Sequence, residues 1–317
     1  MKYSMARFPA DSGISFEMWN KEPTLTKTIF SLKTMTTQNE THRVPVTNLE
    51  MNVSFGCNLK CEYCTHLGRF MKGIVPLEDL LLWYRSWNRK IHPKNIRIMG
   101  GEPLLHPHLE AVLYETRKHW DDSRIELVTN GLLFPKMNHS VFTTFREIRA
   151  HVTVSRHFDD PYYNSMFAAG IGALKKHGIE PHITQSNQHW MKCYCIDEQG
   201  RASPFQSDPE KAWKICYVKN LCTTLIDNCL YRCPQIGCFS YAVKQGFVSD
   251  AWNVVLDYKP LPPSCTQEEL EAFMCGGACE QCSICPEKFE HASMYEKLNP
   301  FGLPIIRTLF CGDADNE

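Results

Sequence analysis

The chain has 317 residues, 43% of them hydrophobic, and its 34 basic and 35 acidic residues leave a formal net charge of −1. A chain of this length can form one large domain and a smaller one around a buried core, with little disorder. The near-zero charge gives no electrostatic support for binding nucleic acid or an anionic membrane surface, so we expect neither partner.

The cysteine content and the absence of targeting signals predict a cytoplasmic metalloprotein. The first residues, MKYSMARFPADSG, contain no apolar stretch of the signal-peptide type. The sequence contains no run of about 18 apolar residues, so we expect no membrane-spanning helix. The sequence has 16 cysteines, and in a reducing compartment such a number indicates metal binding or catalysis rather than disulfides.

From residue 46 onward, predicted strands and helices alternate. Residues 1–45 are weakly patterned, and we interpret them as an N-terminal extension. Apolar residues that alternate predict strands, whereas apolar residues three and four positions apart predict helices. The predicted strands cover residues 49–55, 95–99, 125–131, 152–155 and 182–184, and the predicted helices cover 76–90, 108–120 and 160–178.

This alternation predicts an α/β fold with a parallel sheet and outer helices, here a partial (β/α)6 TIM-like barrel over residues 46–205. Cysteine, glycine and proline dominate residues 206–290, which predicts a small, cysteine-rich, metal-stapled domain, followed by a tail at 291–317. Functional groups on parallel barrels lie at the carboxyl ends of strands. The segments CNLKCEYC, GGEP, TNG and SRH each follow a predicted strand.

The segment CNLKCEYC contains Cys57, Cys61 and Cys64 at the spacing C-x3-C-x2-C. The next cysteine along the chain is Cys193. A structural zinc site usually has four protein ligands, so three thiolates suit an iron–sulfur cluster with one open iron better than zinc.

These motifs resemble those of the radical S-adenosylmethionine (SAM) superfamily. The resemblance covers about residues 48–190 and is carried by CNLKCEYC, by GGEPLLHP at residues 100–107, and by TNG and SRH. It implies that Cys57, Cys61 and Cys64 hold a [4Fe–4S] cluster whose fourth iron binds SAM. It also implies reductive cleavage of SAM to a 5′-deoxyadenosyl radical, with an electron donor such as flavodoxin or ferredoxin.

The resemblance further implies which residues contact SAM. Tyr63 would lie beside adenine, with loop packing as the alternative, and Asn130 would either reach the ligand or cap a turn. The other implied contacts are Gly100, Gly101 and Glu102 near the amino group, Ser155 and Arg156 near the ribose and carboxylate, and Ser186 and Asn187 on the adenine side.

A second group of cysteines follows residue 205. Cys216, Cys222 and Cys233 precede the segment FMCGGACEQCSICP, and TTLIDNCLYRCP predicts a hairpin with an Asp-Asn turn. The region resembles the SPASM and twitch auxiliary domains, although its last cysteines are more compact than in a full SPASM tail. The resemblance implies at least one auxiliary cluster, of the [4Fe–4S] type, with zinc as the alternative. The implied ligands are Cys216, Cys222, Cys233 and at least one of Cys279, Cys282 and Cys285.

The substrate is the least determined part of the prediction. Cys193, Cys195 and His157 are candidate catalytic residues, through hydrogen-atom donation or acid–base chemistry, although a partly buried cysteine pair without function is the alternative. The first hypothesis is oxidation, dehydration or epimerisation of a small polar metabolite such as a sugar, aminocyclitol or nucleoside. The alternatives are a maturase that modifies a ribosomal peptide or protein side chain, and a zinc-binding module without activity.

Overall fold

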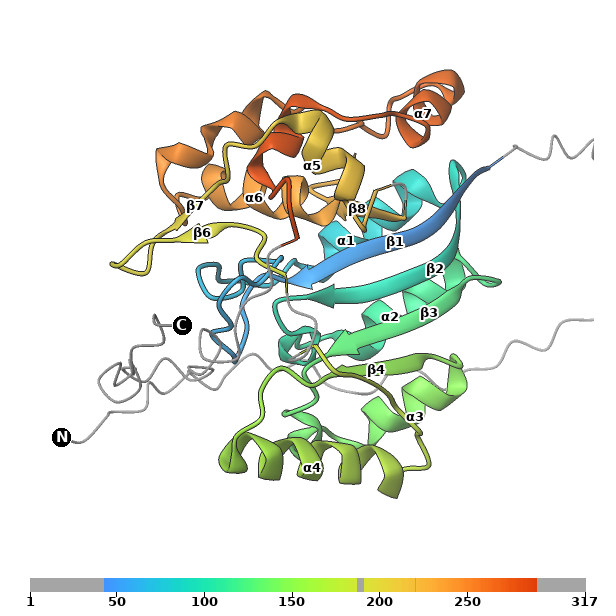
Figure 1. Cartoon of the computed structure of the whole chain (residues 1–317). Helices are drawn as coiled ribbons and strands as arrows, with labels where there is room; N and C mark the ends of the chain where they lie inside the picture. Colours follow the sequence, from blue (N-terminus) through green and yellow to red (C-terminus); the bar gives the residue numbers. More distant parts are fainter. Residues whose placement is uncertain (1–42, 187–190, 220, 290–317) are drawn as a thin grey trace, which may run out of the picture. The chain divides into compact units, whose positions relative to one another are not determined.

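A seven-stranded sheet organises the part of the chain that this computed structural model describes, residues 43–186, 191–219 and 221–289. All of these residues belong to one compact unit, Thr41–Glu317. Its strands are β1 (Val44–Ser54), β2 (Ile91–Gly100), β3 (Arg124–Thr129), β4 (His151–Ser155), β5 (His182–Thr184), β8 (Cys222–Ile226) and β9 (Cys229–Tyr231). They lie in the order β5-β4-β3-β2-β1-β8-β9 (Figure 1), and only the β8–β9 pair is antiparallel. The short strands β6 (Cys195–Ile196) and β7 (Ala202–Ser203) pair separately.

Helices connect the first five strands, so each strand lies beside the one before it in the sequence. The helices are α1 (Leu77–Trp87), α2 (Leu109–His119), α3 (His139–Glu147), α4 (Pro161–Lys176), α5 (Pro209–Ile215), α6 (Pro234–Lys244) and α7 (Gln267–Met274), with 3-10 segments at Pro103–Leu105, Phe134–Lys136, Asp250–Asp257 and Glu280–Ile284. This arrangement confirms the predicted α/β class and partial-barrel strand order. The sequence prediction omitted α3.

The predicted hairpin forms, but it belongs to the main sheet. Asp227 and Asn228 both have positive φ angles, of 51° and 57°, as a two-residue hairpin turn requires. Strand β8 pairs in parallel with residues 48–51 of β1. The indole Nε1 of Trp87 in α1 donates to the carbonyl of Asn228 at 3.1 Å. The segment that the sequence assigned to a small separate domain therefore contributes two strands to the large sheet.

Strand β1 separates an apolar face of the sheet from a polar one. Leu49, Met51 and Val53 are fully buried in the hydrophobic core. The residues between them are polar, and Glu50 and Asn52 are also buried. Because side chains alternate across a strand, these polar groups lie together on the opposite face of the sheet.

Candidate active site

The three predicted cluster cysteines lie in the loop that follows β1. Cys57, Cys61 and Cys64 are each half-buried. The amide of Leu59 donates to the sulfur of Cys57 at 3.4 Å. The amide of Leu67 donates to the Cys64 carbonyl at 2.9 Å. Burial raises the pKa of the Cys64 thiol, and nearby backbone amides partly oppose this rise. The hydrogen bond from Leu59 to the Cys57 sulfur is of the kind that suits a thiolate.

The glycine pair Gly100–Gly101 brings the end of β2 against the end of β1. The amide of Gly101 donates to the carbonyl of Ser54 at 2.8 Å, and the amide of Glu102 donates to that of Gly56 at 2.9 Å. Gly100 has a φ of 141°, and a Cβ on it would collide with the Ser54 carbonyl oxygen. These glycines are therefore explained by the close approach of two backbone segments, whereas the sequence prediction attributed them to close approach of a ligand.

The Glu102 carboxylate joins the turns after β2 and β3 from a fully buried position. One oxygen, Oε1, accepts from the Thr129 hydroxyl at 2.6 Å and from the Leu104 amide at 3.0 Å. The other, Oε2, accepts from the Asn130 amide at 2.9 Å. Burial raises the pKa of Glu102 to about 7 in spite of these three donors. The predicted contact between Glu102 and the SAM amino group stays a prediction.

We expect the stability of the apoprotein to fall as pH rises from about 5 to about 8. The folded-state pKa of Glu102 is about 7, above the ordinary value of 4.5. Glu102 therefore makes its full contribution to the free energy of unfolding below its pKa in the unfolded chain. This contribution is lost as the pH rises through its pKa in the folded protein, and the loss is about 2 to 3 kcal/mol. Urea unfolding of the apoprotein across this range would measure the slope. Glu102→Gln should flatten it, and an equally steep slope in the variant would contradict the assignment.

Asn130 caps a turn and also lies against the cysteine loop. Its Oδ1 accepts from the Leu132 amide at 3.1 Å, which is the turn-capping role. Its Nδ2 donates to Asn58 Oδ1 at 2.8 Å and lies 3.9 Å from the Cys57 sulfur. Asn130 thus lies in contact with a predicted cluster cysteine.

The loop after β4 and the first turn of α4 pack against the cysteine loop through aromatic residues. Phe158 and Tyr163 are buried with Leu59, and the half-buried Cys57 and Cys61 pack against them. The sequence prediction did not single out these three residues, because apolar side chains in such a loop carry no motif. They shield the cysteines from water on this side.

The predicted SAM contacts in this loop are also close to the site. The Ser155 hydroxyl lies 3.2 Å from the Thr184 hydroxyl, at the ends of neighbouring strands. The Arg156 guanidinium binds Asp159 at 2.7 Å and Asn164 at 2.8 Å. The amide of His157 donates to the Tyr163 hydroxyl at 3.0 Å. Ser186 is half-buried just after β5, and Asn187 lies outside the described residues.

Tyr63 packs inside the protein, which is the alternative that the sequence left open. Its side chain is 6% exposed, its ring centroid lies 5.5 Å from that of Tyr194, and Lys192 lies over its face. The adenine contact therefore stays a prediction. Cys193 is buried and its thiol donates to the Tyr63 carbonyl at 3.2 Å, whereas Cys195 is exposed. The two candidate catalytic cysteines thus have different environments.

Six cysteines line a hollow beside α5 and α6. They are Cys193, Cys216, Cys233, Cys279, Cys282 and Cys285. Burial raises the pKa values of Cys216, Cys233 and Cys285, and neighbouring thiols of this set raise them further. The sulfurs of Cys279 and Cys282 are 3.7 Å apart. The donor set of the hollow therefore suits a thiolate-bound cluster with four ligands.

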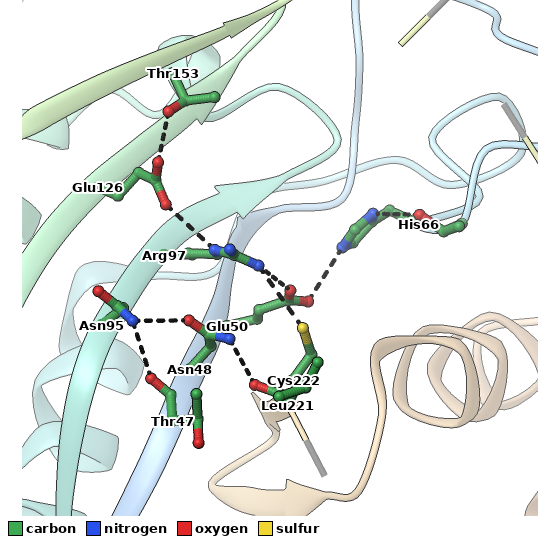
Figure 2. A network of polar contacts seen from close by, with 11 residues as sticks. Thr47, Asn48, Glu50, His66, Asn95, Arg97, Glu126, Thr153, Leu221 and Cys222 are labelled. Atoms are coloured by element: carbon green, nitrogen blue, oxygen red, sulfur yellow. Dashed lines mark hydrogen bonds and ion pairs between the residues drawn. The ribbon is translucent and has the colours of Figure 1, made fainter. Parts of the chain in front are cut away.

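Cys222, predicted as an auxiliary ligand, does not line this hollow. Its sulfur accepts from Arg97 Nη1 at 3.7 Å, in the polar network of Figure 2. Cys222 lies in β8, and the pairing register of a strand fixes the face of the sheet to which each side chain points. This explains why its thiol is not part of the hollow. Among the described residues, no three His, Cys, Asp or Glu side chains converge on one ion position. Cluster cysteines bind separate irons, so the donor sets above still fit iron–sulfur clusters.

Comparison with known proteins finds matches to the segment that carries the cysteine loop. Residues 51–186 match the family model of the Radical SAM superfamily. A GTP 3′,8-cyclase of Staphylococcus saprophyticus is 33% identical over 105 residues, which cover 31% of this chain and 31% of that protein. A GTP 3′,8-cyclase of Clostridium acetobutylicum is 33% identical over 95 residues, 28% of this chain and 29% of that protein. The chain thus spans about a third of the length of these curated relatives.

Two solved structures give weaker likenesses. Native anSMEcpe with bound AdoMet and Cp18Cys peptide is 24% identical, covers 46% of this chain and 45% of that chain, and gives a TM-score of 0.37. BtrN in complex with AdoMet and 2-DOIA is 13% identical, covers 77% of this chain and 98% of that chain, and gives a TM-score of 0.39. No helix among the described residues is long and apolar enough to cross a membrane.

Proposed function

We propose that this chain, which carries a radical SAM domain at residues 51–186, reductively cleaves SAM and uses the 5′-deoxyadenosyl radical to remove a hydrogen atom from a small polar metabolite. The observation that carries the proposal is the meeting of the cysteine loop, the Gly100–Glu102 turn and Asn130 at the carboxyl ends of β1, β2 and β3. Anaerobic reconstitution with iron and sulfide, followed by reduction and measurement of 5′-deoxyadenosine, tests it.

The residues of the loop have distinct proposed roles. Cys57, Cys61 and Cys64 would hold the [4Fe–4S] cluster, which when bound supplies the electron for SAM cleavage. Leu59 and Asn130 offer hydrogen bonds to the Cys57 sulfur. Glu102 holds the turns after β2 and β3 together and so keeps the ligand-binding backbone in place.

An auxiliary cluster in the cysteine-lined hollow is the second part of the proposal. The shared position of Cys216, Cys233, Cys282 and Cys285 in the lining of one hollow supports these four as its ligands. Such a cluster could exchange an electron with the substrate or bind it. Flavodoxin or ferredoxin is the proposed source of electrons for the reaction.

We expect Cys233→Ala to lose about half of the iron of the reconstituted protein, since one of two four-iron clusters would lack a ligand. Cys222→Ala should keep its iron, because this thiol lies outside the hollow. Iron and acid-labile sulfide per chain measure both variants. Equal iron loss in the two variants would restore Cys222 as a ligand. A protein that binds zinc and no sulfide would instead support the zinc module.

A further inference from the structure

Charged and polar side chains form a row across the polar face of the sheet (Figure 2). The row consists of Glu50 on β1, Arg97 on β2, Glu126 on β3 and Thr153 on β4. The strand register places Glu50 directly beside Arg97, and Arg97 directly beside Glu126. Residues opposite each other on neighbouring strands face the same side, so these charges share one surface. None of these residues was singled out by the sequence prediction.

The contacts within the row supply a hydrogen-bond donor to both oxygens of the Glu126 carboxylate, but to only one oxygen of the Glu50 carboxylate. Arg97 Nε donates to Glu126 Oε2 at 3.2 Å, and the Thr153 hydroxyl donates to Glu126 Oε1 at 2.5 Å. Arg97 Nη1 donates to Glu50 Oε1 at 3.4 Å. One guanidinium thus serves two carboxylates, and the row keeps one uncompensated negative charge.

That charge is buried at Glu50. Its Oε2 accepts no hydrogen bond of normal geometry among the described residues, although the side chain is only 6% exposed. The Cys222 thiol, a neutral group, also interacts with this carboxylate. His66 Nε2 lies 4.0 Å from Oε2 and lacks a hydrogen-bond partner among these residues. A buried carboxylate oxygen without a donor is costly, and its persistence indicates a group that joins it from outside the chain.

Glu50 lies beside the cysteine loop, because His66 of this loop is 4.0 Å from its carboxylate. His66 follows the cluster cysteine Cys64 by two positions in the same loop. The pKa of the Cys238 thiol is raised first by burial and then by the charges of Glu50 and Cys64. A molecule bound at Glu50 would therefore lie beside the cysteine loop.

We propose, resting on the function proposed above, that the substrate carries an amine and that this amine binds as an ammonium ion to Oε2 of Glu50. An ammonium group supplies both the missing hydrogen-bond donor and the missing positive charge. A neutral hydroxyl group would supply only the donor. A phosphate or carboxylate group would be repelled, because Arg97 is already engaged by Glu50 and Glu126.

The first test uses the stability of the full chain without substrate. Glu50→Gln removes the buried charge that the single guanidinium of Arg97 must share with Glu126, so its Tm should rise above that of the parent protein. Glu126→Gln removes a charge whose two oxygens are both engaged, so its Tm should fall. A Tm of Glu50→Gln that falls as far as that of Glu126→Gln would make Glu50 a structural residue and overturn the proposal.

The second test uses ethanolamine as the ammonium probe and ethylene glycol as its neutral counterpart, at constant ionic strength, on the anaerobically reconstituted chain. Ethanolamine should raise the Tm of the parent protein and bind Glu50→Gln at least tenfold more weakly, whereas ethylene glycol should not distinguish the two proteins. Failure of ethanolamine to stabilise the parent protein, or equal stabilisation of Glu50→Gln, would overturn the proposal. Loss of SAM cleavage with ethanolamine binding intact would instead contradict only the proposed function.

Discussion

Replacing Cys57 by alanine is expected to abolish formation of 5′-deoxyadenosine, a loss of more than about 1,000-fold. The sulfur of Cys57 accepts a hydrogen bond from the Leu59 amide and lies near the Asn130 side chain, so these contacts fix its position. Burial, followed by the Glu102 charge, raises the pKa of this thiol to about 12 in the absence of metal. Iron binding would provide the opposing charge that a thiolate needs there.

The measurement is 5′-deoxyadenosine released per chain after anaerobic reconstitution and reduction. Cys229→Ala is the matched control, because Cys229 is half-buried in the β8–β9 hairpin and lines neither site. The control should cleave SAM at the parent rate. Normal cleavage by Cys57→Ala would remove the cysteine loop from the proposed mechanism.

Gly101→Ala is expected to destabilise the protein by about 3 kcal/mol or more. A Cβ at this position would collide with the carbonyl oxygen and carbon of Gly56 and would approach the carbonyl oxygen of Phe55 to 2.6 Å. These are backbone atoms, which cannot rotate away as a flexible side chain could. Relief requires separating the end of β1 from the turn after β2. Urea unfolding followed by circular dichroism measures the loss.

Gly172 offers a matched glycine in a different setting. It lies in α4, and a Cβ on it would have no heavy atom within 4 Å. Gly172→Ala should therefore stabilise the protein by about 0.5 to 1 kcal/mol, since alanine favours a helix. If Gly101→Ala is as stable as the parent protein, the two strand ends are not packed as closely as described.

The strands and motifs could be predicted because their signals are local. Residues 182–184 form the predicted strand, and alternating apolar residues mark the middle of β1. Pairing between distant segments gives no such signal. The apolar stretch at residues 222–226 predicts a buried strand, but nothing in it specifies β1 as its partner. The same limit applies to Cys222, because cysteine spacing does not state which side of a strand faces the metal.

The polar row was only partly accessible to sequence reasoning. Glu50 and Asn52 alternate with Met51 and Val53, which predicts a sheet with one polar face. Which of the charges lacks a partner depends on the register of β1, β2 and β3. A single residue shift would place Glu50 on the apolar face. The unpaired oxygen of Glu50 is therefore a property of the assembled sheet.

The pairing of β8 with β1 has a consequence for the order in which the protein can fold. Asn48 donates through its side chain to the carbonyl of Leu221 at 2.7 Å, a contact across 173 positions. During synthesis, one edge of β1 therefore stays without its hydrogen-bond partners until the second cysteine region has left the ribosome. An open strand edge favours pairing with other chains, and closing so long a loop slows folding. Residues 51–186 are thus expected to depend on the C-terminal part of the chain for solubility before any cluster is inserted.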